Sequence, residues 1–145
     1  MSVRFITFVS TLAFALAAGS AQASFFDGKQ GLLCSLYQLY ECDHPNQCVS
    51  VTPGEVMGMS HVDIDFKKKV ITRAGIESAQ KSPIKSVQTG VDGKLIIQGV
   101  EDGAEDQRDG AGWSISIMDP EGTMVMAIAG DGFGIIGLGA CVPKP

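Results

Sequence analysis

Beyond residue 45 the chain alternates between short apolar runs and breaks made of glycine, aspartate and proline. Within residues 61–66, Val62, Ile64 and Phe66 occupy alternate positions, and polar residues stand between them. Residues 113–118 repeat this alternation. A period of two residues is typical of half-buried antiparallel strands. The pattern predicts strands at residues 48–52, 60–66, 69–74, 84–89, 94–101, 113–118, 123–129 and 133–140.

Explicit turn sequences join several of these strands. Val91-Asp92-Gly93 and Asp119-Pro120-Glu121-Gly122 each lie between two apolar runs, as hairpins require. Lys67-Lys68-Lys69 lies between two predicted strands, and we interpret it as a solvated hairpin turn. The connections leave no room for crossover helices, which excludes a parallel sheet. We expect an all-β, mainly antiparallel fold, in which a meander of about eight short strands forms a small barrel or a sandwich.

One segment before these strands shows helical spacing instead. Apolar side chains recur there at i, i+3, i+4 and i+7, which predicts a short amphipathic N-terminal helix. The residues of this repeat are Leu33, Leu36, Tyr37 and Tyr40. Because Leu36, Gln38 and Tyr40 also alternate, a strand is the other interpretation of the segment.

The first 23 residues have the pattern of a cleavable secretory signal. Arg4 precedes an apolar run from Phe5 to Ala18, and Ala21-Gln22-Ala23 supplies small residues at the cut. The run is shorter than the roughly 20 residues that a membrane span needs. We therefore expect a periplasmic or secreted protein with a single domain at residues 24–145, and no membrane-spanning segment after the signal is removed.

Four cysteines lie in the expected mature domain, and an oxidising compartment favours two disulfides among them. Three pairings are possible, and the sequence does not choose among them. We prefer Cys42 with Cys48, across a short turn that contains Pro45, and Cys34 with Cys141. The second bridge would tie the N-terminal segment to the last strand. A metal site built from Cys34, Cys42, His44 and Cys48 is the alternative, but its spacing matches no standard zinc pattern.

Composition and motifs argue against several classes of function. Ten of the 11 Lys and Arg and all 16 Asp and Glu follow residue 23, so the mature domain has a net charge of −6. An acidic domain without a basic stripe is a poor nucleic-acid binder. Of two histidines, His61 has only Asp63 as a near acidic partner, and no G-x-S-x-G motif occurs. We expect neither an enzyme nor a cofactor.

A crowd of carboxylates before Trp113 is the first candidate binding site. These residues are Glu101, Asp102, Glu105, Asp106 and Asp109. They do not follow the calcium-loop pattern, because Gln107 and Ser116 stand where that loop needs acidic ligands. We interpret the segment, together with Trp113, as a negative surface for a cationic partner protein.

Met57, Met59 and His61 are the second candidate. In an extended strand they would project from one face, opposite Val62 and Ile64. Thioether and imidazole groups are donors that suit Cu(I). A copper-handling protein is therefore one alternative function.

The sequence favours an exported, non-enzymatic binding module over this copper-binding alternative. Such a module would engage a cationic protein through the acidic segment, or hold a small apolar ligand in the mouth of a barrel. A structural protein of the cell envelope is the second alternative.

Overall fold

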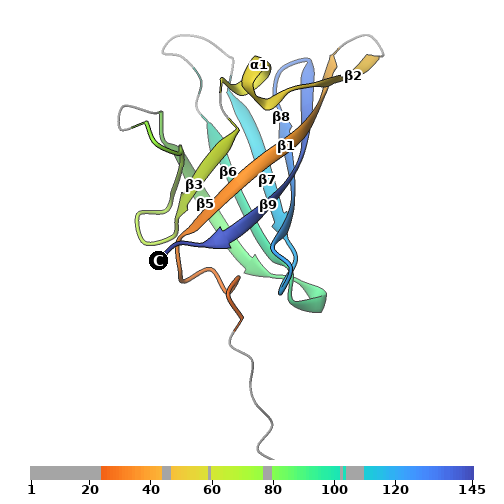
Figure 1. The fold of residues 1–145 in the computed structure, drawn as a ribbon. Coiled ribbons are helices and arrows are strands. Elements are labelled where there is room, and N and C mark those ends of the chain that lie inside the picture. The colour runs from red at the N-terminus through yellow and green to blue at the C-terminus, as the bar shows by residue number, and fades with distance from the viewer. Residues whose placement is uncertain (1–23, 44–46, 59, 77–79, 102, 104–109) are drawn as a thin grey trace, which may run out of the picture.

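The computed structural model describes residues 24–145 except 44–46, 59, 77–79, 102 and 104–109 (Figure 1). The predicted signal at residues 1–23 lies outside this range. Within these described residues, nine strands, one short α-helix and one 3₁₀ turn follow one another. Their bounds are β1 (Leu32–Asp43), β2 (Gln47–Val51), α1 (Pro53–Met57), β3 (His61–Asp65), β4 (Val70–Arg73), β5 (Ser82–Thr89), η1 (Val91–Gly93), β6 (Leu95–Glu101), β7 (Ala111–Ile117), β8 (Thr123–Ala129) and β9 (Phe133–Pro143).

The strands form one antiparallel sheet that closes on itself. Consecutive strands from β3 to β9 are neighbours, β1 pairs with β3, and β9 returns to pair with β1. This closure gives an eight-stranded barrel, visible in Figure 1, and the sandwich alternative is wrong. Strand β2 stands outside the ring and pairs with the second half of β1, from Leu39↔Val51 to Asp43↔Gln47.

The predicted N-terminal helix is wrong, because its residues form strand β1. In this strand Leu32, Cys34 and Leu36 are buried and the residues between them are exposed. A bulge between Leu36 and Gln38 then shifts the alternation by one residue, so that Leu39 is also buried. Of the four residues whose spacing suggested a helix, only Leu36 is buried, whereas Leu33, Tyr37 and Tyr40 are exposed. The apolar repeat therefore combined residues from both faces of the strand.

The expected turns are present and short. Lys67, Lys68 and Lys69 form an exposed turn between β3 and β4. The backbone N–H of Lys68 donates to Asp65 Oδ1 at 2.9 Å, and Lys68 Nζ lies 3.2 Å from Asp65 Oδ2. These contacts hold the pKa of the Asp65 carboxyl below its ordinary value. The turn η1 joins β5 to β6, and residues 118–122 join β7 to β8.

The barrel interior is apolar and is filled at one end. Leu32, Ile64, Leu95, Ile117 and Met124 are each at most 2% exposed. The buried ring of Phe26 lies beside Gly122, in the turn after β7, and so packs against this end of the barrel. Figure 1 shows the N-terminal segment and the η1 turn at this filled end, and α1 at the opposite end.

Both disulfides join residues that face each other on adjacent strands. Cys34 of β1 is bonded to Cys141 of β9, with Cα atoms 3.9 Å apart, and both residues are buried inside the barrel. Cys42 is bonded to Cys48 across the β1–β2 hairpin. These are the pairings preferred from the sequence. The first bridge locks the seam where the sheet closes.

We expect the two bridges to contribute unequally to stability. The Cys34–Cys141 bridge spans 107 residues and the Cys42–Cys48 bridge spans 6. In the chain-entropy model the first contributes about 4–5 kcal/mol and the second about 2 kcal/mol. Urea unfolding of Cys34→Ala/Cys141→Ala should therefore show the larger loss in the free energy of unfolding, with Cys42→Ala/Cys48→Ala as the matched control. Equal losses of unfolding free energy in the two double variants would contradict the larger stabilising role assigned to the Cys34–Cys141 bridge at the seam.

Candidate functional site

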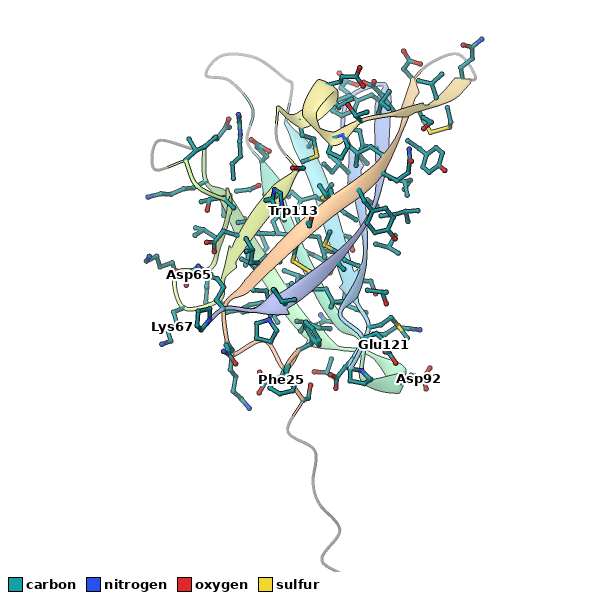
Figure 2. All side chains as sticks on the ribbon, viewed as in Figure 1. Phe25, Asp65, Lys67, Asp92, Trp113 and Glu121 are labelled. Atoms are coloured by element: carbon teal, nitrogen blue, oxygen red, sulfur yellow. A yellow bond between two sulfur atoms is a disulfide. The ribbon has the colours of Figure 1, made fainter. Side chains whose placement is uncertain are left out.

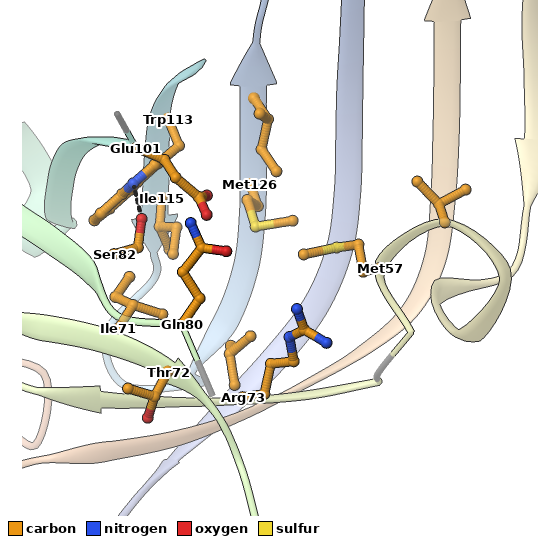
Figure 3. Close-up of a pocket in the computed structure, with 13 residues that line it drawn as sticks. Met57, Ile71, Thr72, Arg73, Gln80, Ser82, Glu101, Trp113, Ile115 and Met126 are labelled. Atoms are coloured by element: carbon orange, nitrogen blue, oxygen red, sulfur yellow. Dashed lines mark hydrogen bonds between the residues drawn. The ribbon is translucent and has the colours of Figure 1, made fainter. Parts of the chain in front are cut away.

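A cavity of about 260 Å³ opens at the α1 end of the barrel (Figure 3). Its wall is made of inward-facing side chains of the strands, and Val56 and Met57 of α1 contribute from one side. The apolar part of the wall consists of Val56, Met57, Val62, Ile71, Trp113, Ile115, Met126 and Ile128. Buried apolar side chains fill the other half of the barrel among the described residues, so the cavity lies at one end of the interior.

Trp113 forms one wall of the cavity and is held in place by two neighbours. Its indole is 8% exposed, and its Nε1–H donates to Ser82 Oγ of β5 at 2.8 Å. Gly99 faces Trp113 across the β6–β7 pair. A Cβ at Gly99 would overlap both the indole ring and the carbonyl oxygen of Pro83, so only glycine leaves room for this position of the ring. Figure 2 shows Trp113 inside the barrel.

Five polar side chains interrupt the apolar wall, namely Thr72, Arg73, Gln80, Ser82 and Glu101. Figure 3 shows Arg73, at the end of β4, Gln80, and Glu101, at the end of β6, in the space between Trp113 and Met57. Arg73 and Glu101 do not form an ion pair with each other. The cavity thus offers a guanidinium donor, a carboxylate acceptor and an amide around an apolar centre. A ligand with an apolar body and a polar group would match this arrangement.

Helix α1 borders the opening and has defined ends. Thr52 precedes it, and Glu55 Oε2 accepts hydrogen bonds from the Thr52 backbone N–H at 3.0 Å and from its hydroxyl at 2.7 Å. These bonds lower the pKa of Glu55. The helix ends at Gly58, whose φ of 62° lies in the left-handed region that favours glycine. The sequence Thr-Pro-Gly-Glu is an N-cap signature, so this helix was recognisable from the sequence.

A second hollow adjoins the cavity on the side of β9. It shares Val56, Gln80, Glu101 and Ile128 with the cavity and extends to Glu41 and Phe133. The two hollows therefore belong to one mouth. Glu41 and Glu101 give this part of the mouth a negative character.

The structure describes two residues of the acidic candidate site. Asp102, Glu105, Asp106 and Asp109 lie outside the described residues. Glu101 and Trp113 both line the cavity, so the structure brings these two together. Trp113 faces the interior and is not part of an outer recognition surface.

Met57 and His61 of the copper candidate do not share a strand face, although their alternation in the sequence suggested that they would. Met57 ends α1 and lines the cavity, whereas His61 is exposed at the start of β3 and its Nδ1 lies 2.9 Å from Ser60 Oγ. Met59 lies outside the described residues. Within the described part of the chain no group of three His, Cys, Asp or Glu side chains is placed to hold a metal. Copper binding by this set stays an untested prediction.

Sequence reasoning missed most of the cavity wall. Arg73 and Gln80 carry no local signal, because only the barrel closure brings them to the same space as the other wall residues. The alternation of residues 113–118 includes Ile115 but does not show that it borders a cavity. Met126 is 4% exposed and also lines the cavity. The alternation within each strand identified the inward positions. It could not show which of these side chains border the cavity and which are covered by other side chains.

Comparison with known proteins identifies no family for this chain. No protein-family model and no curated protein sequence matches the chain. In the described residues no helix is both long and apolar enough to cross a membrane.

We expect Gly99→Ala to disturb the cavity wall. The added methyl group must displace the Trp113 indole or the β5 backbone, at a cost of about 1–3 kcal/mol. Because Trp113 is the one tryptophan of the chain, its fluorescence emission should shift as the unfolding midpoint falls. Gly112→Ala on β7 is the matched control, since a Cβ there meets nothing within 4 Å. A Gly99→Ala protein as stable as Gly112→Ala would disprove the contact.

Proposed function

We propose that this protein is an exported, non-enzymatic binding module that holds a small amphipathic ligand in the mouth of its barrel. The observation that carries the proposal is the cavity at the α1 end of the barrel, with its apolar wall and five polar side chains. An eight-stranded barrel has an interior that side chains either fill or leave open for one small ligand. This barrel combines both arrangements, filled at one end and open at the other.

The size of the cavity limits the ligand. Ligand pockets usually have volumes of about 300–1,000 Å³, and an apolar cavity of about 150 Å³ is enough to hold benzene. At about 260 Å³, this cavity suits a molecule with one ring or a short branched chain. The exposed side of the mouth leaves space for a polar substituent.

The chemistry of the wall defines the class of ligand more closely. The Trp113 ring offers a flat face for stacking, and Ile115 and Met126 provide adaptable apolar contacts. Arg73 and Glu101 can each bind a group of opposite charge or a hydroxyl. A phenyl compound with a hydroxyl, carboxylate or ammonium group meets these requirements.

One feature supports binding over catalysis, and a second supports export over retention in the cytoplasm. The described wall of the cavity contains no histidine and no cysteine, which are the common sources of an activated nucleophile or base. Both disulfides are typical of oxidising compartments outside the cytoplasm, and all four cysteines are engaged in them. The mature domain then acts as a rigid, cross-linked container.

Binding can be tested with 2-phenylethanol, phenylacetate and phenethylamine, three probes that share a ring and differ in charge. We expect saturable quenching or a shift of Trp113 fluorescence with at least one of them. Ile128→Phe should abolish the response, because Ile128 lines the cavity and the larger ring occupies it. Val125→Phe, on the outward side of the same strand, should bind like the unmodified protein.

Two outcomes would overturn the proposal. One is the absence of a saturable response to all three probes by both fluorescence and thermal unfolding. The other is a response that Ile128→Phe leaves unchanged, which would place the probes elsewhere on the protein. Unfolding curves of both variants verify that the barrel is intact.

A further inference from the structure

The outer surface of the barrel seam is unusually apolar. Strands β8 and β9 contain no charged residue, and in β1 the charges are confined to Glu41 and Asp43 at its end. Large apolar or aromatic side chains point outward from these three strands. We call this surface the seam face and define it by Leu33, Tyr37, Tyr40, Val125, Ile136 and Val142, each more than 36% exposed.

The strand register brings residues of the seam face side by side. Leu33 of β1 lies opposite Val142 of β9, and Tyr40 lies opposite Ile136. On the other side of β9, Leu138 lies opposite Val125 of β8. Directly opposed side chains in antiparallel strands are about 4.5–5.5 Å apart, so these pairs are neighbours on the barrel surface. Uncharged polar residues, Ser35, Gln38 and Thr123, lie between them.

The size of the seam face matches that of an interaction site. Strands spaced about 4.8 Å apart with a rise of about 3.3 Å per residue give three strands a surface of roughly 400 Å². Patches of about 300–600 Å² are the largest on typical monomers and are often functional. The charged residues of the other strands are Asp63 and Asp65 of β3, Arg73 of β4, Lys85 of β5 and Glu101 of β6.

Carboxylates border the seam face at both ends. Glu121 lies in the turn before β8, Asp131 in the turn before β9, and Asp43 at the end of β1, and all three are exposed. Lys144, the basic residue that follows β9, is paired with Asp63, with Nζ 2.6 Å from Oδ2. The border of the seam face is therefore acidic without a free cation among these residues.

We propose that the seam face docks a protein partner with an apolar centre and basic residues around it. The apolar centre supplies the area that is removed from water, and the acidic border supplies charge complementarity. The Cys34–Cys141 bridge joins β1 to β9 under this face, so the surface is ordered before binding. Preorganisation lowers the entropic cost of association.

The same border disfavours two other occupants. A second copy of the chain, related by a two-fold axis, would bring acidic borders against acidic borders, because a two-fold interface uses the same patch twice. An anionic lipid surface would also be repelled, since membrane recruitment depends on basic residues. This docking site is independent of the cavity, because its side chains point to the opposite side of the barrel wall.

The test uses two amphipathic helical peptides with identical leucine positions, one with lysine and one with glutamate on the polar face. We expect the lysine peptide to bind at least tenfold more tightly, with an affinity that falls as salt is added. Val125→Thr/Ile136→Thr keeps β-branched residues in the strands but removes apolar surface, and it should weaken binding at least fivefold. Val87→Thr, an equally exposed valine on β5, is the matched control.

Other results would overturn the docking proposal. These are equal binding of both peptides, equal loss in Val87→Thr, or no effect of the double variant whose unfolding midpoint is unchanged. Sedimentation of the protein as a dimer that Val125→Thr/Ile136→Thr dissociates would assign the face to a second copy. Flotation with phosphatidylcholine vesicles, abolished by the same variant, would assign it to a lipid surface. Ring-probe binding in the cavity should be the same in the double variant.

Discussion

The pairing of β1 with β9 is the contact on which the rest of the molecule depends. It runs from Leu32↔Pro143 to Asp43↔Phe133 and converts an open meander into a closed ring. Closure removes two sheet edges and encloses a space that the inward side chains share. The buried Cys34–Cys141 bridge fastens this seam from inside. Both the cavity and the outer seam face exist only because these two distant segments meet.

Side-chain volume inside the ring decides where it is filled and where it is hollow. On β9, Gly137 and Gly139 face the interior and yield their space to Leu36, Leu39 and Met124 from other strands. Near the mouth, Gly99 yields its space to the indole of Trp113, which lies against the wall and leaves the centre open. Glycines at these close-packed positions thus determine where the interior narrows.

The strand pattern was largely predictable, and the exceptions have physical causes. Alternation located β2 to β9 to within about two residues at most ends, because most of these strands have one face toward the core. It failed at β1, where the outward-facing Leu33, Tyr37 and Tyr40 are also apolar or aromatic and, together with the buried Leu36, have helical spacing. For the candidate site, Glu101 and Trp113 were named from a local crowding of charge. Their meeting with Arg73 across the mouth depends on strands distant in sequence.

The sequence by itself determined the antiparallel character, the short turns, the cysteine count and the acidic charge, because each depends on local order or composition. The tertiary structure decided between barrel and sandwich, placed Trp113 inside, and left a cavity of about 260 Å³ at one end. It also gathered the uncharged outer positions of β1, β8 and β9 into one face. These features depend on which strands become neighbours, and that follows from the closure of the sheet and not from any single segment.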